Sequence, residues 1–154
     1  MIIAIVGVLA ITAIGLAGWA LLRPGVGTDP GPSAYSDSQR ADAKAKACAA
    51  FDMVRRGVSR NTSLVIPGGE GDVAGTLAVA ANARIALYDG GQYLLARLDP
   101  ATPQELADTA TGFANTLMDI GAAATAGSLD SDPDQIARLR SADEANVKLG
   151  QLCA

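Results

Sequence analysis

Two cysteines, Cys48 and Cys153, carry the most recognisable chemistry in this sequence, and they lie far apart in the chain. Neither belongs to a Cys-x-x-Cys pair, which is the spacing typical of zinc sites and of thiol–disulfide exchange. In an oxidising compartment two such cysteines form a structural disulfide, whereas two inert buried thiols are the alternative. We interpret them as a structural disulfide and not as a metal or redox site.

Two short segments look like ligand-binding loops but lack the residues that such chemistry requires. The glycines of PGGEGDVAG precede a predicted helix as in a phosphate-binding loop, yet the segment has no lysine, and its two acidic residues would repel phosphate. The segment DSDPD, which begins at Asp130, imitates the start of a calcium loop, but Ser141 stands where an EF-hand needs its glutamate. We therefore predict neither a nucleotide site nor a metal site, and we assign the aspartates to helix capping.

The composition also argues against catalysis and nucleic-acid binding. The chain contains no histidine, the commonest general base and metal ligand, and no nucleophile–base pair can be identified from residue spacing. Its formal net charge is -4, and it has no basic patch that could hold phosphates. We therefore expect a protein that is not an enzyme, has no catalytic residues or cofactor, and does not bind nucleic acid.

Residues 1–23 are predicted to form a transmembrane anchor. The segment Ile2–Leu22 contains no charged residue, and as a helix rising about 1.5 Å per residue it would reach roughly 30 Å, the thickness of the bilayer hydrocarbon. A cleaved signal peptide is the alternative, because Gly18–Ala20 could serve as a cleavage site, but such a peptide would normally begin with basic residues. A buried core helix would show a polar face, which this segment lacks.

One side of the predicted anchor consists of small residues. A helical wheel groups bulky side chains such as Val8, Leu16 and Trp19, and small side chains occupy the remaining surface. Helices in lipid associate by close packing at small residues, so this surface is suited to docking against another membrane helix. The alternative is that small residues simply abound in this alanine-rich chain. The predicted partner-helix face comprises Ala4, Gly7, Ala10, Gly15 and Gly18.

Residues 24–37 are rich in proline, glycine and serine and are predicted to be a flexible linker to a folded head at residues 38–154. The head is predicted to be all-α, because four local patterns are typical of helix starts. These patterns are the capping-box pair Ser36 and Gln39, Asp72 after a glycine turn, the capping box Thr102-Pro103-Gln104-Glu105, and Asp132-Pro133-Asp134-Gln135.

Apolar residues in these helices recur at spacings of three and four, which predicts an antiparallel four-helix bundle. In the first helix they are Ala47, Phe51, Val54 and Val58. In the second, which Gly90-Gly91 either breaks or bends, they are Val73, Leu77, Ala80, Ala81, Ile85 and Tyr88. In the third they are Leu106, Ala110, Phe113, Leu117, Ile120 and Ala124. The fourth helix carries Ile136, Leu139, Ala142, Asn146, Leu149 and Cys153 along the same kind of seam.

This arrangement predicts how the cysteines meet. In an up-down-up-down bundle the last helix lies antiparallel to the first, so the end that carries Cys153 reaches the early turns that carry Cys48. A disulfide requires an oxidising compartment, so we expect a single-pass plasma-membrane protein whose head lies on the extracytoplasmic, periplasmic side. The basic residues near the anchor, Arg23 and Arg40, are too few to decide its orientation by charge.

In layout the chain resembles small single-pass actinobacterial membrane proteins with a helical extracytoplasmic head. Within that group it resembles the accessory association factors of the respiratory cytochrome bcc-aa3 supercomplex, in the segment MIIAIVGVLAITAIGLAGWALL, the linker, and the framing of the head by Cys48 and Cys153. The resemblance implies a supporting role in electron-transfer machinery, with the heme and metal sites in other chains. It assigns no functional residue to this chain.

We therefore predict a non-catalytic, membrane-anchored accessory subunit that docks on and stabilises a larger membrane protein complex. Its expected partners are the lipid bilayer and an integral membrane protein complex, with the cytochrome bcc-aa3 supercomplex as the candidate that the resemblance implies. The alternative is an anchored extracytoplasmic module that binds an apolar or lipid-like ligand between its helices.

Overall fold

The computed structural model of the protein describes residues 34–69 and 71–154, and the compact unit of the head spans Tyr35–Ala154. The predicted anchor with its partner-helix face, and most of the predicted linker, lie outside the described residues. Among the described residues no helix is both long enough and apolar enough to cross a bilayer. The helices of the head are α2 (Asp37–Thr62), α3 (Val73–Leu95), α4 (Gln104–Thr125) and α5 (Pro133–Leu152).

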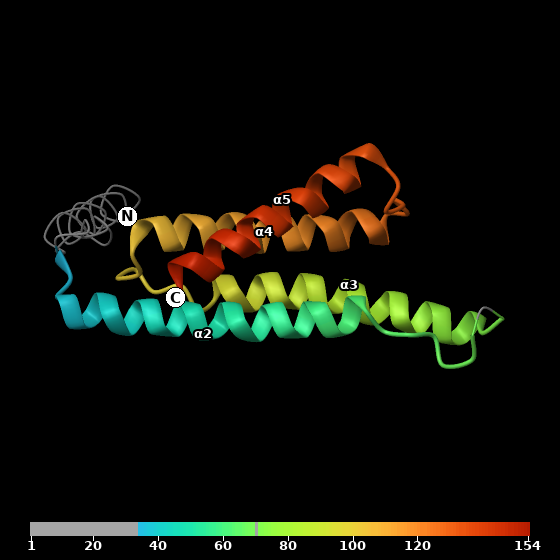
Figure 1. Ribbon diagram of the computed structural model, residues 1–154, viewed down its shortest axis with the longest axis horizontal. Helices are drawn as coiled ribbons and strands as arrows, with labels where there is room; N and C mark the ends of the chain where they lie inside the picture. The colour runs from blue at the N-terminus through green and yellow to red at the C-terminus, as the bar shows by residue number, and fades with distance from the viewer. Residues whose placement is uncertain (1–33, 70) are drawn as a thin grey trace, which may run out of the picture. The chain divides into compact units, whose positions relative to one another are not determined.

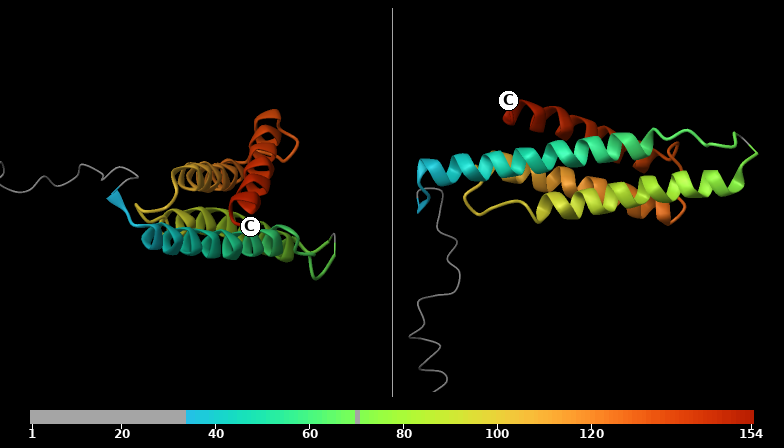
Figure 2. Two further views of the ribbon diagram at one scale, coloured as in Figure 1. Left: turned by 60° about the vertical axis from the view of Figure 1, so that its left-hand side comes forward. Right: turned by 90° about the horizontal axis from the view of Figure 1, so that it is seen from below.

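Consecutive helices of the head run antiparallel, and the head is an all-α helical bundle (Figure 1). This confirms the predicted all-α class of the head. α3 packs against both α2 and α4, whereas α5 packs mainly against α4 and touches α2 only slightly. Figures 1 and 2 show that α5 is inclined to the other three helices and that its first turns diverge from α3. The bundle is therefore open on the side where α5 leaves α3.

Two of the predicted helix starts have the expected caps. At the start of α2 the Gln39 amide donates to Ser36 Oγ at 3.2 Å, and the Ser36 amide donates to Gln39 Oε1 at 2.8 Å, which completes the predicted capping box. At the start of α3 the Gly75 amide donates to Asp72 Oδ1 at 2.8 Å. These side chains satisfy helix N–H groups that have no partner within the first turn.

The other two predicted caps differ in the structure. α4 begins at Gln104 with Pro103 as its cap residue, and no side chain caps it. The predicted Thr102 capping box is wrong, because Thr102 Oγ1 instead accepts from the Asp99 amide at 3.1 Å and closes the preceding turn. Asp132 likewise makes no cap bond to α5 and accepts from the Leu129 amide at 2.9 Å. In both places the polar side chain stabilises the loop that enters the helix.

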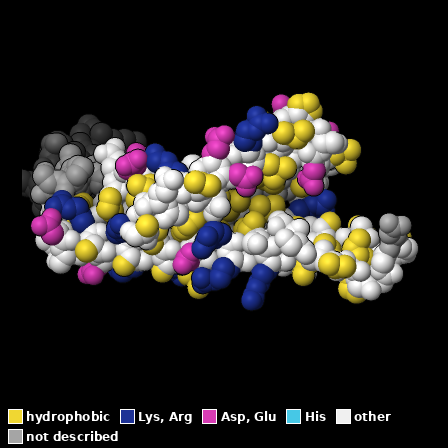
Figure 3. Space-filling view, viewed as in Figure 1, with side chains coloured by type: hydrophobic (Ala, Val, Ile, Leu, Met, Phe, Trp, Pro, Cys, Tyr) yellow, Lys and Arg dark blue, Asp and Glu magenta, His cyan; other side chains and the backbone are white. Residues whose placement is uncertain are grey.

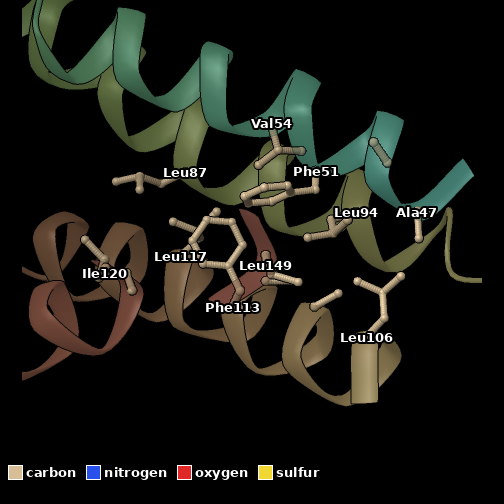
Figure 4. Packing of buried hydrophobic residues seen from close by; sticks show 14 residues of the cluster. Ala47, Phe51, Val54, Leu87, Leu94, Leu106, Phe113, Leu117, Ile120 and Leu149 are labelled. Carbon is tan, nitrogen blue, oxygen red and sulfur yellow. The ribbon is translucent and has the colours of Figure 1, made fainter. Parts of the chain in front are cut away.

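The core lies along the seam predicted for α4. Phe113 is buried at the centre of that seam and meets Phe51 of α2 edge to face, with the ring centroids 5.7 Å apart (Figure 4). Leu94 from α3 and Leu149 from α5 are fully buried in the same cluster. Of the residues predicted for the α4 seam, Ala124 is only half-buried and lines the groove described below. The others are buried as predicted: Leu106, Ala110, Phe113, Leu117 and Ile120.

The predicted apolar face of α3 is wrong over much of its length. Ile85 and Tyr88 are 56% and 52% exposed, whereas the buried residues of α3 are Leu87, Gly91 and Leu94. The reason is the close approach of α4, because a Cβ atom on Gly91 would lie 2.6 Å from the carbonyl oxygen of Ala114. Gly91 therefore sets the contact face, and α3 continues as a helix past both glycines to Leu95.

Candidate functional site

A groove of about 590 Å³ lies where the bundle is open, and all four described helices and the α4–α5 loop line it. Figure 3 shows this region as a notch between α5 with α4 on one side and α3 on the other, with hydrophobic side chains at its closed end. A volume of this size lies within the roughly 300–1,000 Å³ that is usual for ligand-binding clefts. The groove is thus large enough to receive a ligand or part of a partner.

The base of the groove is a continuation of the apolar core. Phe113, Leu117 and Ile120 of α4 and Leu87 of α3 line it and are otherwise buried against other core residues. Because these side chains belong to the packed cluster, the base is preformed and needs no rearrangement to offer apolar surface. Burying such surface is favourable at about 25 cal/mol per Å² of apolar area.

Small side chains on the walls leave the space of the groove unfilled. Ala80 and Ala83 of α3 face the groove from one side, and Ala142 of α5 faces it from the other. Leu139 of α5 also lines the groove and is 37% exposed. The space therefore results from two features, namely the inclination of α5 and the small residues on the walls.

The basic and the acidic residues of the groove lie on opposite walls. Arg55 of α2 and Arg84 of α3 lie on one wall, and Asp143 of α5 and Asp130 of the α4–α5 loop lie on the other. Arg55 pairs with Asp52 at 3.0 Å. Arg84 is half-buried and forms no ion pair within the described part of the chain. The groove thus has a basic wall and an acidic wall above an apolar base.

Two amides on the inner side of α5 have different roles. Gln135 is fully buried, its Nε2 donates to the Ile120 carbonyl at 3.2 Å, and its Oε1 accepts from Arg138 at 3.3 Å. It therefore fastens the start of α5 to α4, and it replaces the predicted inward residue Ile136, which is 43% exposed. Asn146 lines the groove, and its Oδ1 atom is buried without a hydrogen-bond partner in the described residues.

The predicted disulfide pair closes the other end of α5. Cys48 of α2 and Cys153 at the end of α5 are bonded, with their Cα atoms 5.5 Å apart, which confirms the predicted pairing. Both are half-buried against the core cluster. The cap residue that follows α5 is thus joined to α2, while Gln135 joins the first turn of α5 to α4. These two attachments fix the inclination that opens the groove.

The residues predicted for function are therefore only partly located by the structure. The cysteines meet as expected, and the partner-helix face of the anchor lies outside the described residues. In the described ranges no three His, Cys, Asp or Glu side chains gather in a way that could hold a metal ion. Sequence reasoning did not locate the groove, although Asn146, an amide on the otherwise apolar seam predicted for the fourth helix, was a signal that this seam is not a closed core.

Comparison of the chain with protein-family models, with curated proteins and with solved structures finds no match. The resemblance to supercomplex accessory factors therefore remains a prediction from layout. The site must be interpreted from its own geometry, which is that of a binding surface with a preformed apolar base and walls of opposite charge.

Proposed function

We propose that the protein is a non-catalytic, membrane-anchored accessory subunit that docks on a larger membrane protein complex and stabilises it. The groove between α5 and the α2–α3 hairpin is the observation that carries the proposal, because a preformed apolar cleft is the usual form of a binding site. The uncharged segment Ile2–Leu22 supports the anchor, which would hold this groove beside other membrane proteins. The cytochrome bcc-aa3 supercomplex is the candidate complex on the sequence resemblance alone.

Exposed apolar side chains next to the groove support docking. Leu129 in the α4–α5 loop is 64% exposed, and Ile136 in the first turn of α5 is 43% exposed. Leu129 and Leu139 line the groove, so its apolar surface extends to exposed side chains. Contiguous exposed apolar surface with a polar rim is typical of protein–protein or membrane contact sites. A partner would remove this surface from water.

The Cys48–Cys153 pair supports a location outside the cytoplasm. Structural disulfides persist in oxidising compartments and are rare in the reducing cytosol. We therefore propose a single-pass plasma-membrane protein with its head on the extracytoplasmic, periplasmic side. In this location the groove would face the external domains of a membrane complex. A single membrane span would be enough to hold it there.

A second candidate function is an anchored module for an apolar or lipid-like ligand. It is favoured by the groove volume of about 590 Å³ and by the unpartnered Oδ1 of Asn146, which could accept a hydrogen bond from a ligand. A buried acceptor without a partner costs roughly 1–3 kcal/mol, so a donor on a bound molecule would recover part of that energy.

Purification of the full chain from its native membranes in mild detergent distinguishes the two candidates. The docking proposal expects a large membrane complex to co-purify in fixed stoichiometry. A lone chain that yields a small molecule on solvent extraction would support the ligand-binding module instead. A lone chain without any extractable molecule would contradict both.

A further inference from the structure

The buried contact face of α3 is one end of a longer seam. Leu87, Gly91 and Leu94 pack against α4 and are spaced by four and three residues. Continuing the same alternation toward the start of the helix leads to Arg84 and then to Ala80, and both of these line the groove. Residues at such spacings occupy one stripe of a helix. The core face and the groove face of α3 are therefore a single continuous stripe.

The stripe extends beyond the groove. Its next two positions are Leu77 and Val73, which are 64% and 72% exposed. In Figure 1 the first turns of α3 project past the ends of α4 and α5, so no described helix covers them. A compact ligand in the groove would leave both residues in water. An elongated partner lying along α3 would cover both, which favours a partner with the length of several helical turns.

Charge on the walls specifies the partner further. Arg84 lies within the stripe, is half-buried, and forms no ion pair with any described residue. The acidic groups that face the groove from the other side are Asp130 and Asp143, both exposed. A half-buried cation at a docking surface is best compensated by a carboxylate of the partner. Asp130 and Asp143 on the opposite wall favour basic groups of the partner for the same reason.

We propose that the groove and the exposed half of the α3 stripe together receive one amphipathic helix of the partner protein. The stripe from Val73 to Leu87 spans roughly 20 Å at about 1.5 Å per residue, so the partner helix has about four turns. Its apolar stripe packs on the base of the groove, an acidic residue faces Arg84, and basic residues face Asp130 and Asp143. This inference rests on the proposed docking function and names the partner element.

Site-specific photo-crosslinking in native membranes tests the inference. Benzoylphenylalanine is introduced into the full chain at Leu77, at Leu139, or at Met53, which is 54% exposed and lies outside the groove. We expect Leu77 and Leu139 to crosslink to one segment of one protein, at positions three, four or seven residues apart, with acidic and basic residues on its two sides. Met53 should not reach that segment.

A charge-reversal series provides the matched control. Arg84→Glu should lower the yield of the Leu77 crosslink at least tenfold, and replacing the facing acid of the partner by lysine should restore it. Arg140→Glu changes the charge equally on an exposed part of α5 that does not line the groove, and it should leave the yield unchanged. Equal yields for the two reversals would overturn the assigned polarity of the partner helix.

The outcomes separate this inference from the proposed function. If the complex co-purifies but the crosslinks fall at Met53 alone or nowhere, the docking function stands and the helix inference is wrong. Crosslinks to lipid only, or to a second copy of this chain, would also overturn the inference. If no complex co-purifies with the wild-type chain, the proposed function fails, and the inference fails with it.

Discussion

Gly91 of α3 lies directly against Ala114 of α4, so that a Cβ atom on Gly91 would be 2.6 Å from the Ala114 carbonyl oxygen. The same added atom would be 2.6 Å from Cγ of Met118. Gly112, on the exposed side of α4, has no neighbouring atom within 4 Å of its Cβ position. Glycine at position 91 is therefore what allows the backbones of α3 and α4 to meet, whereas glycine at position 112 has no packing role.

Alanine at these two glycines should change stability in opposite directions. Gly91→Ala forces two packed backbones apart and should lower the free energy of unfolding by about 1–3 kcal/mol, as for other overpacked cores. Gly112→Ala only restricts the unfolded chain and should raise it by about 0.5–1 kcal/mol. Thermal unfolding followed by circular dichroism measures both. Equal midpoints for the two variants would mean that the α3–α4 contact is looser than described.

Removal of the disulfide should destabilise the head. The bond joins residues separated by 105 positions, and for a loop of this size the chain-entropy model gives a stabilisation of about 4–5 kcal/mol. Cys48→Ser combined with Cys153→Ser should therefore lower the unfolding midpoint strongly. Non-reducing peptide mapping of the native protein should show the two cysteine peptides linked, and labelling of both thiols in unreduced, unfolded protein would contradict the pairing.

Spacing predicted α4 well because its seam is apolar at every position and carries no competing face. The predicted residues Leu106, Ala110, Phe113, Leu117 and Ile120 are all buried. The meeting of Cys48 with Cys153 followed from the antiparallel order of the helices. The contact face of α3 was harder to predict, because it passes through Arg84 and Gly91 while larger apolar residues lie beside it. Apolar size alone therefore pointed to the wrong positions after Ala80.

The groove could not be predicted, because it depends on the angle of α5. That angle is set by long-range contacts, in particular the bond from Gln135 to the Ile120 carbonyl at one end and the disulfide at the other. No local pattern encodes such an angle. Only Asn146 on the predicted seam of α5 indicated that this part of the helix does not pack in a closed core.

The small-residue face of the anchor is expected to contact a partner helix. Replacing Gly7, Gly15 or Gly18 by leucine should separate the helix backbones and lose van der Waals contact, so co-purification with the complex should fall. Val8→Leu and Leu16→Ile on the bulky side should leave it unchanged, and all of these variants should still insert into the membrane. Equal recovery of the complex with the variants of the small-residue side and of the bulky side would show that the anchor only tethers the head.

The orientation of the chain can be checked with a protease that does not cross membranes. On intact spheroplasts we expect the protease to remove the head while the anchor remains in the membrane, because the disulfide implies an oxidising side. A cytoplasmic protein serves as the control, because it resists the protease as long as the spheroplasts are intact. A head that survives until the cells are lysed would place it in the cytoplasm and contradict the proposed location.

The most direct test of docking through the groove compares two alanines on α3. Ala80 lines the groove, whereas Ala78 on the same helix is exposed and does not. Ala80→Trp should fill the groove and lower recovery of the co-purifying membrane complex at least tenfold, while Ala78→Trp should give wild-type recovery, with unchanged circular dichroism for both full-length variants. Equal recovery of the complex with both variants would contradict the account.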